Sequence, residues 1–348
     1  MNPCENQRMA HASSSLTDSD TPNKPRRKRW KIVAIVAAAL VVALAAAAGI
    51  LYWNIQTKFD QIETIEDPFP DETSRPEKIP SDAMNILLLG SDSRADASKP
   101  ILDDLGNRSD TIMVMHIPAD RSGVQVMSIM RDSYVEIPGH GEDKINHAMS
   151  YGGVKLMVQT VESIIDQRID HVAVVDFNGF KGMTNALGGV EVNNPEAFNA
   201  SPPVNTHFPA GKIKLKGDDA LAYVRERKTF DDGDYTRVEN QQRFLKAMFS
   251  NVMSRDVLLN PGKATALIDE TVKYVATDDG VNPGFMFGLG QSMVSLKGSD
   301  ITSFTLPTLG TDTVNGMSIV TVNWDEVQTL REKFAKDELG DYQPKARP

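Results

Sequence analysis

The chain contains a single cysteine, Cys4, among its 348 residues. A disulfide framework is therefore excluded, and the folded part must be stabilised by its own apolar core. An excess of positive charge is also missing, because 47 acidic residues outnumber 37 basic ones and the formal net charge is −10. That balance excludes a broad electrostatic surface for nucleic acid, so no nucleic-acid partner is expected.

One long stretch lacks charged residues altogether: residues 32 to 53 read IVAIVAAALVVALAAAAGILYW. As a helix, these 22 residues would rise about 33 Å, and a bilayer core is roughly 30 Å thick. The stretch has no polar face, which disfavours a helix that packs in the core of a globular domain. Signal peptides have apolar regions of roughly 7 to 15 residues, so a cleaved signal is disfavoured and a retained transmembrane anchor is predicted.

The residues before this stretch set its orientation. Residues 24 to 31 read KPRRKRWK, and residues 1 to 31 together carry seven Lys or Arg and three Asp or Glu. Because basic flanks stay in the cytoplasm, residues 1 to 31 are predicted to be a disordered, basic cytoplasmic tail. The protein is thus expected in the cell membrane as a single-pass protein, with an extracellular C-terminal domain whose net charge is about −14.

The remainder of the chain divides into three parts. Residues 54 to 83 include PFPDETSRPEKIP, which predicts a charged, proline-stiffened extracytoplasmic linker. Residues 84 to 255 are expected to form the main folded domain. For residues 256 to 348 two interpretations stay open, namely a C-terminal part of the same lobe or an accessory extension.

Apolar runs and helical spacings alternate along the folded part. Strands are predicted at residues 84–89, 111–116, 123–130, 171–177, 212–215, 301–306 and 318–322. Helices are predicted at residues 152–166, 177–187, 218–224, 234–254, 262–278, 284–297 and 324–336. This alternation predicts an α/β fold in which helices sandwich a mixed central sheet.

Arginine and aspartate recur together in four segments. These are Gly90-Ser91-Asp92-Ser93-Arg94, Arg108-Ser109-Asp110-Thr111, Arg131-Asp132-Ser133, and Arg225-Glu226-Arg227 followed by Asp234 and Arg237. Several arginines held near a few carboxylates suit a phosphate or pyrophosphate bridged by a divalent metal. Each segment alone also fits a structural role, such as an Asx-turn at Asp92, a strand cap at Asp110 or a salt bridge in Arg131-Asp132.

The fourth segment places three polar groups on one helix face. Asp234, Arg237 and Gln241 follow the i, i+3, i+7 spacing of neighbours on a helix. Asp234 falls in the first turn, where anionic ligands also find free N–H groups. Arg225 and Arg227 point the same way if that stretch is extended, and a charged surface loop is the alternative interpretation.

Further motifs lie between these segments in a definite order. The whole set is Ser109-Asp110-Thr111, residues 128 to 132, Lys144-Ile145-Asn146-His147-Ala148 with Tyr151-Gly152-Gly153, Leu187-Gly188-Gly189-Val190, Ala220-Leu221-Ala222-Tyr223-Val224-Arg225-Glu226-Arg227, and Asp234-x-x-Arg237 with Gln241-Gln242. In this order the motifs closely resemble those of the LytR-CpsA-Psr family. The match runs from about residue 85 to about residue 248, and a looser similarity extends to about residue 336.

The resemblance implies a membrane-anchored phosphotransferase of Gram-positive-type cell walls. Such a protein moves a glycopolymer from a polyprenyl pyrophosphate carrier to peptidoglycan and releases polyprenyl phosphate. Its α/β sandwich would hold a long apolar pocket for the polyprenyl chain, and its cofactor would be Mg²⁺ or Mn²⁺. Teichoic acid, capsular polysaccharide and arabinogalactan all stay open as the transferred polymer.

The resemblance also implies roles for individual residues. Asp92 and Asp110 resemble the metal ligands. The groups that would bind the pyrophosphate are Arg94, Arg108, Arg131, Lys144, Arg225, Arg227, Arg237 and Gln241. Asp92, Asp110, Arg131, Asp234 and Arg237 are the expected catalytic set, in which Asp234 is either a general base or a group that orients arginines.

Two positions depart from the family pattern, and two other functions stay open. Asn240 stands where an arginine is usual, which removes a positive charge, and Met130 stands where proline is usual, which loosens the backbone there.

The same site could serve a hydrolase that cleaves lipid-linked pyrophosphate with water as acceptor. A protein that only binds polyprenyl phosphate, with a regulatory role like that of a transcriptional attenuator, is the other alternative.

Overall fold

The computed structural model describes residues 53, 56–91, 101–102, 109–202, 204–252, 254, 257 and 260–344. Contacts divide the chain into two units, Met1–Trp53 and Asn54–Pro348, and almost all described residues belong to the second. Every helix among the described residues is too short or too polar to cross a bilayer. The predicted tail, residues 1 to 31, and the predicted anchor, residues 32 to 53, lie outside the described residues apart from Trp53.

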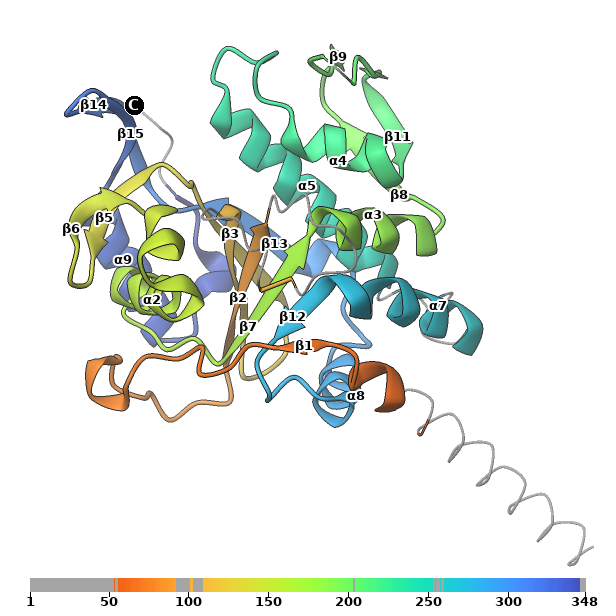
Figure 1. Ribbon diagram of the computed structural model, residues 1–348, viewed down its shortest axis with the longest axis horizontal. Helices are drawn as coiled ribbons and strands as arrows, with labels where there is room; N and C mark the ends of the chain where they lie inside the picture. The colour runs from red at the N-terminus through yellow and green to blue at the C-terminus, as the bar shows by residue number, and fades with distance from the viewer. Residues whose placement is uncertain are drawn as a thin grey trace, which may run out of the picture. The chain divides into compact units, whose positions relative to one another are not determined.

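A mixed seven-stranded sheet forms the centre of the Asn54–Pro348 unit (Figure 1). Its strands are β1 (Glu63–Thr64), β2 (Met84–Ser91), β3 (Ser109–Ile117), β4 (Val124–Ile129), β7 (His171–Asp176), β12 (Val275–Thr277) and β13 (Ile301–Thr305). Their spatial order is β1-β12-β7-β2-β3-β4-β13. β2 is parallel to β7 and β4 is parallel to β13, whereas β3 is antiparallel to both β2 and β4.

Smaller sheets surround this one. Their strands are β5 (Ser133–Ile137), β6 (Gly141–Lys144), β8 (Val190–Asn194), β9 (Phe198–Asn199), β10 (His207–Phe208), β11 (Gly211–Leu215), β14 (Thr308–Val314) and β15 (Met317–Val322). β14, β15, β5 and β6 form a four-stranded sheet in that order, while β8 pairs with β11 and β9 with β10. The four-stranded sheet therefore joins a hairpin near the C-terminus to a hairpin that directly follows β4.

The helices account for most of the remaining described residues. They are α2 (His147–Ile165), α3 (Phe177–Ala186), α4 (Gly217–Arg225), α5 (Asp234–Val252), α7 (Pro261–Thr271), α8 (Pro283–Ser292) and α9 (Trp324–Ala335), with short 3-10 turns at Glu72–Ser74, Val272–Tyr274, Gly298–Asp300 and Leu339–Asp341. α2 is kinked at Gly152 and Gly153, where the φ of Gly153 is 62°. That left-handed backbone favours glycine.

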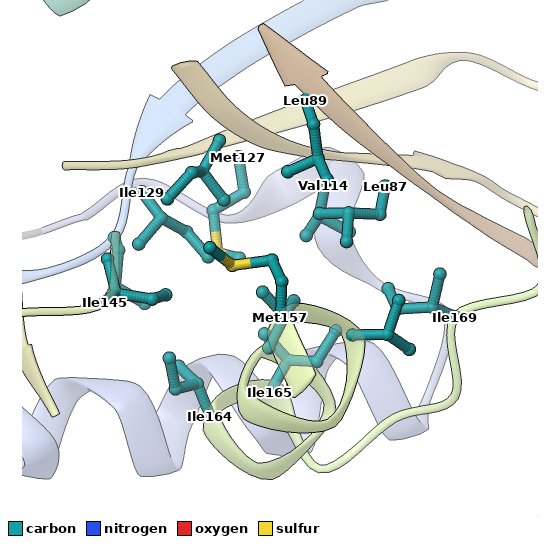
Figure 2. Packing of buried hydrophobic residues seen from close by; sticks show 14 of the residues in the cluster. Leu87, Leu89, Val114, Met127, Ile129, Ile145, Met157, Ile164, Ile165 and Ile169 are labelled. Carbon is teal, nitrogen blue, oxygen red and sulfur yellow. The ribbon is translucent and has the colours of Figure 1, made fainter. Parts of the chain in front are cut away.

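Both faces of the central sheet are buried. Leu87 and Leu89 of β2 face the core cluster that contains α2 and α9, whereas Ile86 and Leu88 face the cluster that contains α5 and α8. This alternation is the period of two expected of a strand. Figure 2 shows Met157 of α2 reaching from its helix toward side chains of the sheet. Figure 1 shows α2 and α9 together on one side of the strands.

The predicted α/β fold, with a mixed sheet between helices, is confirmed. Every predicted strand is present, but the helix predicted at residues 262 to 278 is only partly correct. α7 ends at Thr271, and Val275–Thr277 form β12, which pairs with β7 inside the central sheet. Three residues are too few to display an alternating pattern, so the sequence could not separate this strand from the end of a helix.

The structure differs from the prediction of a linker at residues 54 to 83. β1 pairs with β12, so this segment contributes a strand to the central sheet. Arg75 also reaches Glu162 of α2, with 2.6 Å between Nη2 and Oε1, and donates to the carbonyl of Ile169. The Glu162 side chain is only 1% exposed, so its charge requires this partner. A stretch with the composition of a stiff linker is thus fixed to the domain.

Residues 256 to 348 complete the same unit. β12 and β13 belong to the central sheet, and β15 pairs in parallel with β5. Leu330 and Phe334 of α9 are buried in the core cluster on one sheet face. Of the two interpretations left open by the sequence, the structure therefore supports a C-terminal part of the same lobe.

Arg75→Ala is expected to lower the free energy of unfolding by about 3 to 5 kcal/mol, because it leaves the buried Glu162 carboxylate unpaired. Urea unfolding followed by circular dichroism measures the change. Lys155→Ala is the matched control, since Lys155 and its partner Asp67 are exposed, and the expected cost is less than about 1 kcal/mol. Equal costs for the two variants would contradict the importance given to the buried pair.

A second buried charge ties β7 to the residues after β12. The Asp278 carboxylate accepts hydrogen bonds from Nδ1 of His171 at 3.0 Å, and from the backbone N–H groups of Val172 and Gly280 at 2.8 and 2.9 Å. Burial by itself raises the pKa of Asp278. The hydrogen bonds outweigh burial, so the pKa lies below its ordinary value of 3.8.

This depressed pKa predicts a specific acid sensitivity. At a pH above the ordinary pKa of 3.8, ionised Asp278 stabilises the folded state. This stabilisation is lost as the pH falls through the lower pKa of Asp278 in the folded state. Asp278→Asn is therefore expected to flatten the decrease in the free energy of unfolding between about pH 5 and pH 2, measured by urea unfolding at each pH. Asp269→Asn, at a half-exposed carboxylate, is the control. If the free energy of unfolding of Asp278→Asn fell as steeply with decreasing pH as that of the wild type, the stabilising role of ionised Asp278 would be contradicted.

Candidate active site

Strand directions bring several predicted site residues to one edge of the central sheet. β3 is antiparallel to β2 and β4, so its first residues lie beside the last residues of those two strands. Ser109 is paired with Ser91, and Ile112 with Ile129. Asp110, at the start of β3, and Arg131, just past the end of β4, therefore meet at this edge. Site residues of α/β sheets are generally found at such strand ends.

Two close contacts fix the chain at this edge. A Cβ added to Gly90 would lie 2.8 Å from the Cβ of Thr111, so only glycine allows β2 and β3 to approach this closely. From α5, Nε2 of Gln241 donates to Oγ1 of Thr111 at 3.3 Å and to the carbonyl of Val224 at 3.2 Å. Gln241 therefore holds α5 beside the residue that follows Asp110.

Arg131 is the centre of an ion-pair network. Its Nη1 lies 2.5 Å from Oδ1 of Asp110, and its Nε lies 3.5 Å from Oδ2 of Asp132 and 3.9 Å from Oδ2 of Asp234. All four side chains are about one-fifth exposed. One guanidinium thus connects carboxylates from β3, from the turn after β4 and from α5.

Lys144 extends this network from β6. Its Nζ lies 3.1 Å from Oδ1 of Asp132. The backbone around it is fixed to the same turn, because the N–H of Asn146 donates to the carbonyl of Arg131 at 3.2 Å and the N–H of Ile145 donates to that of Ser133 at 2.9 Å. The β5–β6 hairpin therefore carries its lysine to the arginine at the end of β4.

Asp234, at the first residue of α5, gathers the remaining cations. Its Oδ2 lies 3.2 Å from Nη2 of Arg237, and its Oδ1 lies 3.7 Å from Nη1 of Arg227. Arg237 is 6% exposed, whereas Arg227 is nearly half exposed. Together with its contact to Arg131, Asp234 touches three arginines from three different segments, which suits a group that orients them.

Burial and charge act in opposite directions on the two inner arginines. Burial by itself lowers the pKa of Arg131, but Asp110 and the neighbouring carboxylates outweigh it and the pKa is raised. For Arg237 burial prevails, and the pKa is lowered in spite of Asp234. The Nε atoms of both arginines are buried and have no hydrogen-bond partner among the described residues. An added anion would compensate the Arg237 charge and accept from these N–H groups.

A pocket of about 320 Å³ opens over this cluster. Asp132, Lys144, Arg227 and Asp234 line one part of it, and residues of the β14–β15 hairpin, including Thr311 and Ser318, line another. The sequence did not predict β14. The C-terminal segment thus contributes directly to the walls of the site.

Most of the described site residues that were predicted are brought together. The cluster contains Asp110, Arg131, Lys144, Arg227, Asp234, Arg237 and Gln241. Arg225 behaves differently: it is the exposed last residue of α4, and its guanidinium lies 4.3 Å from the ring centre of Phe177. The extended backbone that would have aligned it with Arg227 is absent from this stretch, because α4 continues through Arg225. Asp92, Arg94 and Arg108 lie outside the described residues.

Two residues of this turn were only partly anticipated from the sequence: Asp132 was considered as a salt-bridge partner of Arg131 but not of Lys144, and Met130 was considered only as a departure from proline. Asp132 links Arg131 to Lys144, and the adjacent basic residue was the one available signal. Met130 is 1% exposed and packs with Tyr235, Val238 and Val320. Its carbonyl accepts from the N–H of Ser133 at 2.9 Å, so the backbone is closed into a turn without proline.

Only one of the two predicted metal ligands can be compared with the structure. Asp110 presents a half-buried carboxylate at the sheet edge, and carboxylate oxygens are the ligands that Mg²⁺ prefers. Asp110 therefore fits the predicted metal. Among the described residues, no group of three His, Cys, Asp or Glu side chains could hold a metal ion. Asp92 is the residue directly after Ser91, the last described residue of β2.

The fold and the cluster define a class of protein: an α/β domain that gathers arginines and a lysine at one edge of its sheet, as phosphate-binding domains do. The chain belongs to the LytR_cpsA_psr family, whose model matches residues 51–336. The family resemblance of the ordered motifs is thereby confirmed.

Named relatives cover much of the chain. The cell wall biosynthesis protein LcpA of Corynebacterium glutamicum is 33% identical over 303 residues, which cover 75% of this chain and 57% of LcpA. The polyisoprenyl-teichoic acid–peptidoglycan teichoic acid transferase TagU of Enterococcus faecalis is 33% identical over 251 residues, covering 71% of this chain and 79% of TagU. The crystal structure of B. subtilis TagV has a TM-score of 0.63 at 26% identity and covers 76% of this chain and 99% of TagV. The homologues therefore include a cell wall biosynthesis protein and teichoic acid transferases.

The two aspartates at the centre of the cluster are expected to differ in their effect on stability. Asp234→Ala leaves the buried Arg237 without its carboxylate, and the expected loss in the free energy of unfolding is about 3 kcal/mol. Asp110→Ala leaves Arg131 with two other carboxylates, so the expected loss is about 1 kcal/mol. Urea unfolding of both variants measures the difference. A larger loss for Asp110→Ala would show that Arg131, rather than Arg237, is the less compensated cation.

Proposed function

We propose that the chain is a membrane-anchored phosphotransferase that moves a glycopolymer from a polyprenyl pyrophosphate carrier to a hydroxyl group of peptidoglycan. The observation that carries this proposal is the gathering of Arg131, Lys144, Arg227 and Arg237 at one sheet edge of an acidic chain. Concentrated positive charge in such a chain points to a small, highly anionic ligand. The teichoic acid transferases among the homologues support the same reaction class.

The arginines supply what phosphoryl transfer most requires. The reaction depends on in-line positioning and on neutralising charge on the phosphoryl oxygens. The Nε of Arg237 is buried without a hydrogen-bond partner among the described residues, Arg131 adds charge beside it, and Arg227 and Lys144 line the pocket. Asp110 and Asp92 would hold a Mg²⁺ or Mn²⁺ ion, which supplies further neutralisation of the pyrophosphate when bound.

The proposed reaction breaks a phosphoanhydride bond and forms a phosphate ester bond. The acceptor hydroxyl oxygen attacks the phosphorus attached to the glycan, and the bond from that phosphorus to the bridging oxygen breaks. The carrier leaves as polyprenyl phosphate, and the hydroxyl proton passes to a base. The three arginine contacts of Asp234 suit the role of orienting those arginines, because a carboxylate so engaged has few oxygen lone pairs left for a proton.

The lipid part of the carrier requires an apolar surface close to this cluster. Met113 and Met115 of β3 face the layer formed with α5 and α8, which also contains Met84 and Met293. Methionine is unbranched and flexible, so a layer rich in methionine can rearrange around an inserted chain. This layer supports the proposal as the place where the polyprenyl chain binds.

Transfer by the full-length chain in detergent micelles tests the proposal. The assay supplies a polyprenyl-pyrophosphate-linked glycan, peptidoglycan oligomers and Mg²⁺, and measures released polyprenyl phosphate and glycan joined to peptidoglycan. Asp110→Ala and Arg131→Ala are each expected to lower the rate about 100-fold or more, because each removes charge stabilisation at the transferring phosphoryl group. Chelation by EDTA is expected to abolish the reaction, and added Mg²⁺ or Mn²⁺ to restore it.

Lys155→Ala, which removes an exposed lysine on α2, is the control and is expected to keep the wild-type rate. Release of free phosphorylated glycan, without glycan joined to peptidoglycan, would indicate a hydrolase in place of a transferase. Binding of the lipid carrier without turnover would favour the regulatory alternative.

A further inference from the structure

A second hollow adjoins the active-site pocket. Two pockets, of about 590 and 260 Å³, share the lining residues Glu196, Phe198, Phe230 and Thr236. They form one depression between residues 194–199, the turn at residues 229–232 and α5, which we name the α5 groove. Asp232 lines both this groove and the active-site pocket. The groove therefore begins at the place where the proposed phosphoryl transfer occurs.

The charge of the α5 groove is opposite to that of the active-site cluster. Its ionisable lining residues are four carboxylates and one guanidinium, namely Glu196, Asp231, Asp232, Glu239 and Arg243. The guanidinium is already paired, since Nη2 of Arg243 lies 2.9 Å from Oε2 of Glu239. A polymer with a phosphate in every repeat would meet like charge along this surface. Unfavourable juxtaposition of like charges is a common means of excluding the wrong ligand.

One wall of the groove carries a hydrogen-bond donor that the protein leaves unused. Asn240 is 1% exposed, and its Oδ1 accepts from Nη1 of Arg243 at 2.6 Å. Arginine can only donate, so this contact fixes the orientation of the amide and leaves Nδ2 as the other group. Nδ2 is buried without a partner among the described residues, although Asn240 lines the groove. A buried donor in this state is stabilised by an acceptor from a ligand.

The floor of the groove is aromatic. Phe230 and Phe198 line both pockets, with their ring centres 4.9 Å apart in an edge-to-face arrangement. Phe198 is buried, whereas Phe230 is partly exposed to the groove. Binding sites commonly combine such apolar surface with a few polar groups that set the orientation of the ligand. Carboxylates, one amide donor and an aromatic floor fit the hydroxyl groups and the apolar ring faces of sugars.

We propose that the α5 groove binds an uncharged saccharide chain that bears hydroxyl and acetamido groups, and that it disfavours phosphate-rich polymers. Nδ2 of Asn240 donates to a carbonyl or hydroxyl oxygen of the saccharide, and Phe230 packs against a ring face. This inference rests on the proposed function and names the class of substrate next to the transferred phosphoryl group.

The first measurement is binding to the full-length chain in detergent micelles, by ligand-observed NMR. The probes are tetra-N-acetylchitotetraose, which is uncharged and acetamido-bearing, and a glycerol phosphate oligomer of similar length. The wild type is expected to bind the saccharide at least about 10-fold more tightly than the phosphate oligomer. Equal affinity for the two probes, or tighter binding of the phosphate oligomer, overturns the proposal.

Variants locate the binding in the groove. Asn240→Leu keeps the side-chain volume but removes the donor, and Phe230→Ala removes the partly exposed ring without opening the buried core around Phe198. Each is expected to weaken saccharide binding about 10-fold. Glu196→Gln with Asp231→Asn is expected to tighten binding of the phosphate oligomer, because the double change removes two negative charges from the groove. Lys212→Ala, which removes an exposed side chain of β11, is the matched control. Wild-type saccharide affinity in both Asn240→Leu and Phe230→Ala overturns the assignment.

The transfer assay then separates the two sources of such a saccharide. If the groove binds the sugars of the donor, Asn240→Leu raises the KM for the donor alone. If the groove binds the glycan strand of peptidoglycan, Asn240→Leu raises the KM for the acceptor alone. Either result supports the groove, whereas unchanged values for both substrates overturn it. Failure of the proposed function is a distinct result, because the wild type would then bind the saccharide probe without transferring any glycan.

Discussion

Compensation of like charges by three carboxylates is the interaction on which the site depends. Arg131, Lys144, Arg227 and Arg237 come from four segments and would repel one another at one sheet edge. Asp110, Asp132 and Asp234 lie among them and join the segments through shared contacts. Each carboxylate contacts a cation from another segment. These contacts fix the start of β3, the C-terminal ends of β4 and β6 and the start of α5 relative to one another. The cluster keeps a small excess of positive charge, which an anionic substrate can neutralise.

Much of the fold was readable from the sequence, since long apolar runs and helical spacings mark the strands and helices of the central layers. Strands β1, β5, β6, β8, β9, β10, β12 and β14 were not predicted. β12 is three residues long, and β14 is mostly exposed, so neither shows the buried alternating pattern that identifies a strand. The prediction of a linker at residues 54 to 83 was wrong for another reason. Its prolines and charges are typical of a linker, but one arginine meets a buried glutamate that lies 87 positions away in the sequence. Pairings at such separation leave no local signal.

The site shows the same limit at the level of single residues. Helical spacing was enough to place Asp234, Arg237 and Gln241 together, because one helix face carries all three. The position of Arg225 depended on whether the backbone was extended or helical there, and the helix continues through it. Thr311 and Ser318 of the β14–β15 hairpin line the pocket because β15 pairs in parallel with β5. No sequence motif predicts this pairing. Local periodicity therefore predicts which side chains share an element, and tertiary pairing decides which elements share a site.

The placement of β13 and β15 also has a consequence for synthesis. β13 covers the edge of β4 next to the turn that carries Arg131, and β15 covers β5, yet both come from the last fifth of the chain. A ribosome delivers the chain from the N-terminus, so the edge of β4 stays unpaired until β13 has emerged, and the edge of β5 until β15 has emerged. A nascent chain that already contains every arginine of the cluster still lacks a closed pocket. A product shortened before β15 would have an open strand edge at β5 and an incomplete pocket, so β15 is a late part of the candidate site to be assembled.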